Sequence, residues 1–190
     1  MNAFPFQSAL GKRILAASWS NPALIDMYCT AARYLKSCEG FETHFVTDNP
    51  SGACLFQSHS HNAYALMDLV NLKGLRPVTL SQSDETWIDD FDRRIGKTPP
   101  ASPALLVAAY GLLIDALGAG AVLVWNGSYA IQRALAVAAR LRGVPVFYLE
   151  RGLLPGALVI DPLGVNYASR LAGERWKAID VGPDDPTAFD

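Results

Sequence analysis

The chain has 190 residues, of which 51% are hydrophobic and 18% are charged, and its formal net charge is −2. This length and composition predict one globular domain with a substantial core and exclude a largely disordered chain. The charge is not the clustered basic excess of nucleic-acid-binding proteins, so we expect no nucleic-acid partner. The sequence has neither an apolar run of about 18 residues nor a signal-peptide pattern, which predicts a cytoplasmic protein.

The chain begins its regular structure with an apolar run, Ile14–Ala17, that predicts a buried strand. A helix follows, because Asn21 is a good N-cap, Pro22 suits the first helical position, and apolar residues recur at helical spacing as far as Gly40. A dinucleotide-binding domain needs glycines between this strand and helix, where the backbone approaches a pyrophosphate. Residues 18–22 contain no glycine, which excludes an NAD or FAD site of that type.

The next part of the chain predicts short strands around one helix. Phe41–Thr47 and Ala53–Phe56 are apolar runs separated by turn residues, which predicts two consecutive strands. Ser60 can cap a helix that Gly74 ends, and Pro77–Leu80 predicts a further short strand. The alternation of strands and helices therefore continues.

The segment Ser81–Pro100 interrupts this alternation, because acidic residues crowd around a few large apolar ones. We expect a mobile surface segment there, either a solvated amphipathic helix or loop, or a lid over a bound acceptor. Ser102 and Pro103 then start a helix that ends at Gly118.

The most regular pattern lies between Val122 and Asn166. Val122–Trp125 and Val144–Leu149 are continuous apolar runs, which predict adjacent parallel strands buried on both faces. The helix between them, Ser128 to Arg142, has an apolar stripe that we expect to face inward, with Arg133 on the solvent side. This βαβ unit predicts an α/β fold with a Rossmann-like, mostly parallel sheet flanked by helices.

The turn after the first strand of this unit, Asn126-Gly127-Ser128, is the first candidate for a binding site. Backbone N–H groups at the start of a helix can bind an anion, but a plain N-cap explains Ser128 equally well. A hydrolase nucleophile would need Gly-x-Ser-x-Gly and a later histidine. The turn does not fit that motif and all three histidines come earlier, which argues against an α/β-hydrolase.

Two carboxylates follow in the second half of the unit. Glu150 comes directly after a buried strand, and Asp161 lies in the loop region beyond it. Functional carboxylates lie at the ends of parallel strands, so both are catalytic candidates. Alternatively, Glu150 pairs with Arg151 or Arg133 and has only a structural role. The many glycines and prolines that begin at Gly152 favour a fixed loop of the kind that holds a site.

The sequence indicates neither a metal site nor a disulfide framework. His59 and His61 lie on the same side of an extended segment, but no third ligand stands beside them. Cys29, Cys38 and Cys54 are odd in number and form no Cys-x-x-Cys pair. We therefore expect no metal ion, and reduced thiols that are mostly buried.

The same βαβ unit resembles a known family. The resemblance rests on Trp125-Asn126-Gly127, Gly143-Val144-Pro145, Tyr148–Pro155 and Asp161–Asn166. These segments are similar to the capsule polysaccharide biosynthesis family of the KpsS/LipB and KpsC/LipA type. The resemblance implies one half of a GT-B enzyme, a retaining β-Kdo glycosyltransferase that uses CMP-Kdo as donor and needs no resident cofactor.

The resemblance also implies roles for single residues. Glu150 would be the carboxylate of the family's Glu-x-Gly element, and Asn166 would belong to its Gly-Val-Asn element. KpsC-like members have an acidic residue where this chain has Arg151, so Glu150 or Asp161 would have to serve in catalysis. The residues expected to bind substrate are Asn126, Gly127, Ser128, Arg151, Gly152 and Asn166.

The family's histidine-proline motif, which belongs to its second half, has no counterpart in this sequence. We therefore expect residues 1–179 to be an N-terminal Rossmann-like half and residues 180–190 to be a linker or disordered tail. The implied partners are a nucleotide-sugar donor, a lipid-linked saccharide acceptor and a second Rossmann-like half or partner subunit, with at most peripheral contact to the inner membrane. The alternative is a non-catalytic Rossmann-like binding module or partner subunit in polysaccharide assembly.

Overall fold

The structure is a computed structural model that describes residues 12–151 and 158–165. Its strands are β1 (Arg13–Ser18), β2 (Glu42–Thr47), β3 (Asn62–Ala65), β4 (Ala121–Trp125), β5 (Val146–Arg151) and β6 (Leu158–Asp161). Its helices are α1 (Pro22–Glu39), α2 (Pro50–Ser58), α3 (Leu66–Val70), α4 (Gln82–Arg94), α5 (Pro103–Leu117) and α6 (Ala130–Arg140).

The strands form one six-stranded sheet in the order β3-β2-β1-β4-β5-β6. The first five are parallel, and β6 pairs antiparallel with β5. The expected Rossmann-like, mostly parallel sheet is thus confirmed, including the adjacent parallel strands β4 and β5. The strand order reverses between β1 and β4, and open α/β sheets bind ligands beside the carboxyl ends of the strands at such a switch point.

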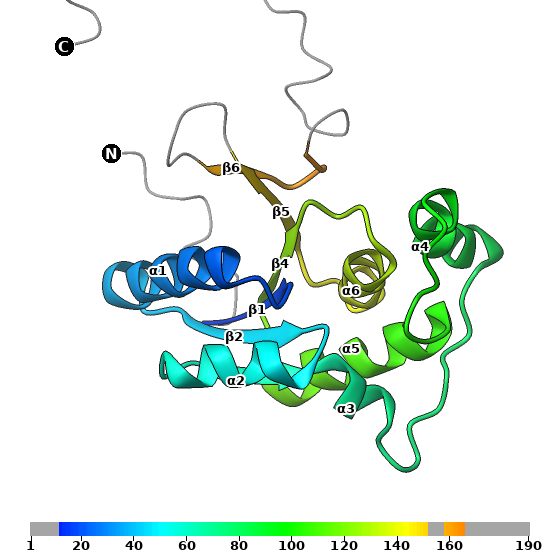
Figure 1. Ribbon diagram of the computed structural model, residues 1–190, viewed down its shortest axis with the longest axis horizontal. Helices are drawn as coiled ribbons and strands as arrows, with labels where there is room; N and C mark the ends of the chain where they lie inside the picture. Colours follow the sequence, from blue (N-terminus) through cyan, green and yellow to red (C-terminus); the bar gives the residue numbers. More distant parts are fainter. Residues whose placement is uncertain (1–11, 152–157, 166–190) are drawn as a thin grey trace, which may run out of the picture.

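Two layers of helices bury the two faces of the sheet. Successive side chains of a strand point to opposite faces, so Leu15 and Ala17 join one core cluster while Ala16 joins the other. Helices α1 and α2 pack on the face of Ala16, and α5 and α6 pack on the opposite face. Figure 1 shows α1 and α6 on opposite sides of β4, with α4 outside α6.

The prediction of a strand at Ala53–Phe56 is wrong, because these residues lie in α2. The Asn49 side chain accepts a hydrogen bond from the backbone N–H of Gly52, and Pro50 occupies the first turn, so the segment has a complete helix start. Ala53 and Phe56 are buried three positions apart, on one face of the helix. A four-residue apolar run does not distinguish this pattern from a strand.

The helix expected from Ser60 to Gly74 is also largely wrong. Asn62–Ala65 forms β3 and pairs parallel with β2, and only the five residues of α3 are helical. Ser60 has a φ of 64°, so it belongs to the turn before β3. Pro77–Leu80, expected to be a strand, has no regular structure.

The segment expected to be mobile, Ser81–Pro100, contains the regular helix α4, so the amphipathic-helix alternative is confirmed. The Ser81 hydroxyl accepts a hydrogen bond from the N–H of Asp84, and acidic residues in the first turn with Arg93 and Arg94 in the last suit the helix dipole. Ile88 is fully buried in the core cluster beneath α6. The helix is therefore part of the folded domain.

Helix α6 is shorter than predicted, since it begins at Ala130 and not at Ser128, and ends at Arg140. The expected inward stripe consists of Ile131, Leu135, Ala138 and Leu141, and it is confirmed for the first three, which are buried, but not for Leu141, which is 55% exposed. Arg133, expected on the solvent side, is 6% exposed. Its guanidinium donates to the carbonyls of Gly127 and Trp87 and lies over the Trp87 ring, so nonlocal partners compensate its burial.

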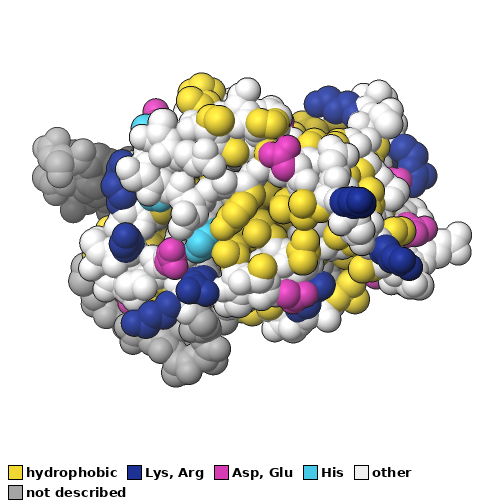
Figure 2. All heavy atoms as spheres, turned by 90° about the horizontal axis from the view of Figure 1, so that it is seen from below, with side chains coloured by type: hydrophobic (Ala, Val, Ile, Leu, Met, Phe, Trp, Pro, Cys, Tyr) yellow, Lys and Arg dark blue, Asp and Glu magenta, His cyan; other side chains and the backbone are white. Residues whose placement is uncertain are grey.

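The face seen from below in Figure 1 has hydrophobic side chains at its centre with charged side chains around them (Figure 2). Helix α3 has five residues, so it covers only a short stretch of the sheet.

In the described part of the chain, no helix has the length and apolar character needed to cross a membrane.

Candidate functional site

A fixed carboxylate lies at the carboxyl end of β5. The Asn126 side-chain amide donates to Oε2 of Glu150 at 2.5 Å, and the backbone N–H of Arg151 donates to Oε1 at 2.9 Å. The Ser128 hydroxyl donates in turn to Oδ1 of Asn126. The structure thus brings together Glu150, Asn126 and Ser128 in one hydrogen-bonded chain. Because both oxygens of the half-exposed carboxylate have a donor, its orientation is set before any ligand arrives.

The turn that carries Asn126 is itself fixed by backbone hydrogen bonds. The N–H of Asn126 donates to the carbonyl of Leu149 at 2.8 Å, and the N–H of Gly127 donates to the carbonyl of Trp125. Asn126 has a φ of 58°, a left-handed conformation that asparagine adopts more readily than most residues. This conformation places its side chain against the end of the neighbouring strand, where Glu150 lies.

Four N–H groups at the start of α6, those of Tyr129, Ala130, Gln132 and Arg133, have partners within the protein. Those of Gln132 and Arg133 donate to the carbonyl of Tyr129, and that of Tyr129 donates to the side-chain oxygen of Gln132. The N–H of Ala130 donates to the carboxylate of Asp92 in α4 at 3.4 Å. The expectation that Ser128 is the N-cap is wrong, because Tyr129 is the N-cap and the Ser128 hydroxyl donates to Asn126. Asp92 occupies the place that an anion would take at the N–H of Ala130.

Asp92 is a buried carboxylate that the sequence analysis did not identify. It is 6% exposed, and one of its oxygens lacks a hydrogen-bond partner within the described residues. Burial raises the pKa of this carboxyl group, and the hydrogen bond from Ala130 and the charge of Lys97 only partly oppose the rise. No local pattern could have revealed it, since its partner Ala130 lies 38 positions away along the chain.

The raised pKa predicts a pH-dependent effect of Asp92→Asn. The folded state holds this proton more tightly than the unfolded state, so the ionised carboxylate costs the wild type stability as the pH rises above 3.8, the ordinary pKa of an aspartate. The amide is uncharged and can still accept the N–H of Ala130. We therefore expect the stability of Asp92→Asn relative to wild type to increase from pH 4 to pH 7, measured by urea unfolding. A difference that stays constant over this range would contradict the prediction.

Aromatic rings line the switch point between β1 and β4. Trp19 follows β1 and meets the ring of Tyr129, which follows β4, edge to face at a centroid distance of 4.9 Å. Phe91 contacts the same ring at 5.0 Å, and the Lys97 ammonium lies 5.1 Å from its centroid. The cluster was not among the sites predicted from the sequence. Trp19 between a strand and a helix was the one signal that could have indicated it.

A second carboxylate lies at the carboxyl end of β2. Asp48 accepts hydrogen bonds from the hydroxyl and the backbone N–H of Ser20, at 2.6 and 3.1 Å. Gly52 allows this close approach, because an added Cβ there would lie 2.2 Å from the Ser20 hydroxyl oxygen. The loop after β1 is therefore fixed to the start of α2.

The structure places Asp161 beside β5, two positions further back along that strand than Glu150. Asp161 is buried and pairs with Tyr148 across the antiparallel β5–β6 pair, while Glu150 pairs with Val159. Asp161 is therefore a diagonal neighbour of Glu150 on the same face, at about 7–8 Å between Cα atoms. Its carboxylate accepts a hydrogen bond from the N–H of Leu163 at 2.8 Å.

The remaining predicted residues are only partly described. Arg151 is exposed at the last position of β5. Gly152, Asn166 and the expected tail at residues 180–190 lie outside the described residues.

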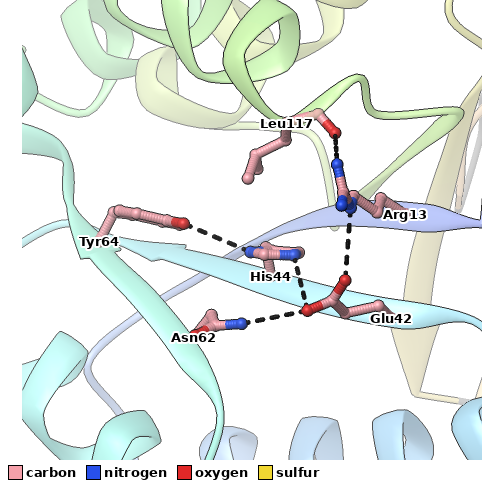
Figure 3. Close-up of polar contacts among 6 residues, drawn as sticks. All are labelled: Arg13, Glu42, His44, Asn62, Tyr64 and Leu117. Carbon is pink, nitrogen blue, oxygen red and sulfur yellow. Dashed lines mark hydrogen bonds and ion pairs between the residues drawn. The ribbon is translucent and has the colours of Figure 1, made fainter.

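A different polar cluster lies at the opposite, amino-terminal edge of the sheet (Figure 3). Glu42 contacts Arg13 of β1, His44 of β2 and Asn62 of β3, at 3.3 to 3.4 Å. The Tyr64 hydroxyl lies 3.4 Å from Nδ1 of the buried His44. The Arg13 guanidinium also reaches the carbonyl of Leu117 at the end of α5. These contacts join three strands to a helix, which is a structural role, and the sequence analysis did not anticipate them.

The histidines considered as metal ligands are not part of a larger ligand group. His59 lies 3.7 Å from Asp26, and His61 meets the ring of Phe45 edge to face. Burial lowers the pKa of His61, and the nearby charges lower it further. Within residues 12–151 and 158–165, no cluster of three or more His, Cys, Asp or Glu side chains could hold a metal ion. Of the cysteines, Cys29 is buried, while Cys38 and Cys54 are exposed, contrary to the expectation of mostly buried thiols.

No protein-family model matches this sequence. No curated protein matches it either. Among solved structures, the chain is similar to S. aureus MnaA with UDP, at 15% identity and a TM-score of 0.44 over 75% of this chain and 30% of that one. It is also similar to a putative UDP-N-acetylglucosamine 2-epimerase from Listeria monocytogenes, at 14% identity and a TM-score of 0.46 over 76% of this chain and 32% of that one.

A further similar structure is the Streptomyces sp. SF2575 glycosyltransferase SsfS6 with thymidine diphosphate. It is 11% identical, with a TM-score of 0.41 over 72% of this chain and 37% of that one. The chain thus spans about a third of the length of each of these proteins. At these values the likeness is one of fold alone.

Proposed function

We propose that this chain forms the N-terminal half of a retaining glycosyltransferase of the Kdo-transferase type, acting in capsule or surface polysaccharide synthesis. The observation that carries the proposal is the carboxylate of Glu150, fixed by Asn126 and by the N–H of Arg151 at the carboxyl edge of the sheet. A retaining transferase needs such a carboxylate on one face of the sugar, as nucleophile or to stabilise the positive charge of the transition state. The resemblance of residues around Glu150 to the capsule family adds the expected donor, CMP-Kdo.

The other residues have supporting roles in this proposal. Asn126 and Ser128 orient Glu150 and offer polar atoms to sugar hydroxyls, while Arg151 is placed to meet an anionic sugar or acceptor. Gly127, Gly152 and Asn166 are assigned to the substrate-binding loops by the resemblance. Asp161 is the second choice for catalysis, because it lies on the same face but towards the other end of β5.

The donor's phosphate has to be held elsewhere in this proposal. The N–H groups of Ala130, Gln132 and Arg133 at the start of α6 already have protein partners, and that of Ala130 donates to the carboxylate of Asp92. A phosphate at that position would meet a negative charge. The proposal therefore assigns the nucleotide to a second Rossmann-like half or a partner subunit, and gives this chain the acceptor side and the catalytic carboxylate.

Isothermal titration with CMP-Kdo tests this assignment. We expect residues 1–190 alone to bind CMP-Kdo weakly, with a Kd in the millimolar range or above, because the proposal assigns the nucleotide to the second half. Adding the second half should produce binding and transfer. A micromolar Kd for the isolated chain, about a thousandfold lower than the expected millimolar value, would contradict the proposal.

The alternative is a non-catalytic Rossmann-like module that assists polysaccharide assembly. One observation favours it, namely that each oxygen of Glu150 already accepts a hydrogen bond within the protein, as a purely structural carboxylate would. The two functions differ in what Glu150→Gln does. The variant stops transfer if Glu150 is catalytic, and changes only stability if it is structural.

A further inference from the structure

A pocket lies between α4, α6 and β5, apart from the site at the carboxyl edge. Its volume is about 420 Å³, within the roughly 300–1,000 Å³ of small-molecule sites. The lining residues that matter here are Trp87, Ala136, Arg140, Val144, Val146 and Tyr148. Val146 and Tyr148 come from the first half of β5, whereas Glu150 lies near its end.

The walls of the pocket are aromatic and aliphatic. Trp87 is 37% exposed, so a large aromatic surface remains open to a ligand. The guanidinium of Arg133 lies over the Trp87 ring, 5.0 Å from the ring centroid, and donates a hydrogen bond to the backbone carbonyl of Trp87. These two contacts fix Trp87 in place. The ring of Tyr148 packs against Gly127, since an added Cβ at that glycine would lie 2.7 Å from the ring.

Arg140 is the charged residue among those that line the pocket, and it forms an ion pair with Asp84. Arg140 is exposed and donates through Nη2 to Oδ1 of Asp84, which also accepts the Ser81 hydroxyl through its other oxygen. A guanidinium has five N–H donors, and this bond uses one of them. Burial raises the pKa of the Tyr148 hydroxyl, while the charges of Arg140 and Arg133 lower it, so both cations act on the pocket wall.

From this combination we propose that the pocket binds a small molecule with a flat aromatic ring and one anionic group. The ring would pack against Trp87 and Tyr148, and the anion would accept hydrogen bonds from the guanidinium of Arg140, which Asp84 holds in position. The inference goes beyond the proposed glycosyl transfer and does not depend on it. Its test needs neither a sugar donor nor a second half of the enzyme.

The test is an NMR titration of the full chain with 2-naphthoate, its uncharged analogue 2-naphthamide, and cyclohexanecarboxylate. Methyl signals of Ala136, Val144 and Val146 report occupancy of the pocket. We expect 2-naphthoate to shift these signals and to bind about tenfold more tightly than each of the other two compounds. Arg140→Gln should remove the preference for the acid over the amide. Arg94→Gln, which removes an exposed arginine paired with Asp90 on α4, should keep it.

Three results would overturn the inference. The first is equal affinity for 2-naphthoate and 2-naphthamide in the wild type. The second is an equal loss of preference in the Arg140→Gln and Arg94→Gln variants. The third is no change at the three methyl groups up to about 10 mM of 2-naphthoate, which would mean that the pocket is filled by the protein itself or closed to ligands. None of these results bears on Glu150, so the proposed transferase function stands or falls separately.

Discussion

Replacing Gly127 by alanine is expected to lower the free energy of unfolding by about 3 kcal/mol, the sum of two costs. Gly127 has a φ of 74°, a left-handed conformation that costs an L-residue roughly 1–2 kcal/mol. In addition, the new Cβ would lie 2.7 Å from two ring carbons of Tyr148. Relieving that overlap by moving a packed ring or the turn costs about 1–3 kcal/mol more. Urea unfolding at neutral pH measures the total.

Gly143→Ala is the matched control for this prediction. Gly143 has a φ of 67°, nearly the same conformation, but no atom lies within 4 Å of an added Cβ. The control should therefore lose only the conformational term, about 1–2 kcal/mol. The difference between the two variants isolates the contact with Tyr148. Equal losses would show that the ring moves away freely and that Tyr148 does not fix the turn.

The central part of the fold could be predicted because its signals are long and local. The apolar run of β4, the helical stripe of α6 and the apolar run of β5 each extend over several residues, and the strand pairing follows from them. In the first half of the chain, the apolar run at Ala53–Phe56 is as long as Val122–Trp125, but it lies in a helix and not in a strand. Four apolar residues at Ala53–Phe56 fit a strand and a helix turn equally well, and only the cap at Asn49 distinguishes them. Asn49 stands directly before Pro50 in the sequence, so the signal for a helix start was present, but the apolar run was given more weight.

The candidate site could be predicted in part for a similar reason. Asn126 follows directly after β4 and Glu150 lies near the end of the adjacent parallel strand β5, and the carboxyl ends of parallel strands meet at one edge of the sheet. The burial of Asp92 and Arg133 could not be predicted. Both depend on contacts between α4 and α6, whose residues are far apart in the sequence. Asp161 was expected beside Glu150 on the assumption of an irregular loop. The antiparallel strand β6 places it further back along β5.

Glu150→Gln is expected to reduce sugar transfer by at least about 10²-fold, in an assay that contains the second half of the enzyme and CMP-Kdo. A neutral amide can neither attack the anomeric carbon nor stabilise positive charge on the sugar. The variant should fold normally. The Asn126 side-chain amide can turn over, so that its oxygen accepts a hydrogen bond from the NH₂ group of the new glutamine. The Asn126 NH₂ group then donates to the Ser128 hydroxyl, which can either donate or accept. Titration should show donor affinity within about twofold of wild type, because the nucleotide is held elsewhere.

Glu42→Gln provides the matched control for this experiment. Glu42 is a carboxylate with several polar partners on the same sheet, but it lies at the amino-terminal edge, away from the switch point (Figure 3). Its replacement should leave the transfer rate unchanged, even where the loss of contacts with Arg13 and His44 lowers stability. If both variants transfer sugar at the wild-type rate, Glu150 is a structural carboxylate and the non-catalytic module becomes the better account. If only Glu150→Gln is inactive while its unfolding curve and donor affinity match wild type, the fixed carboxylate at the end of β5 acts in the chemical step.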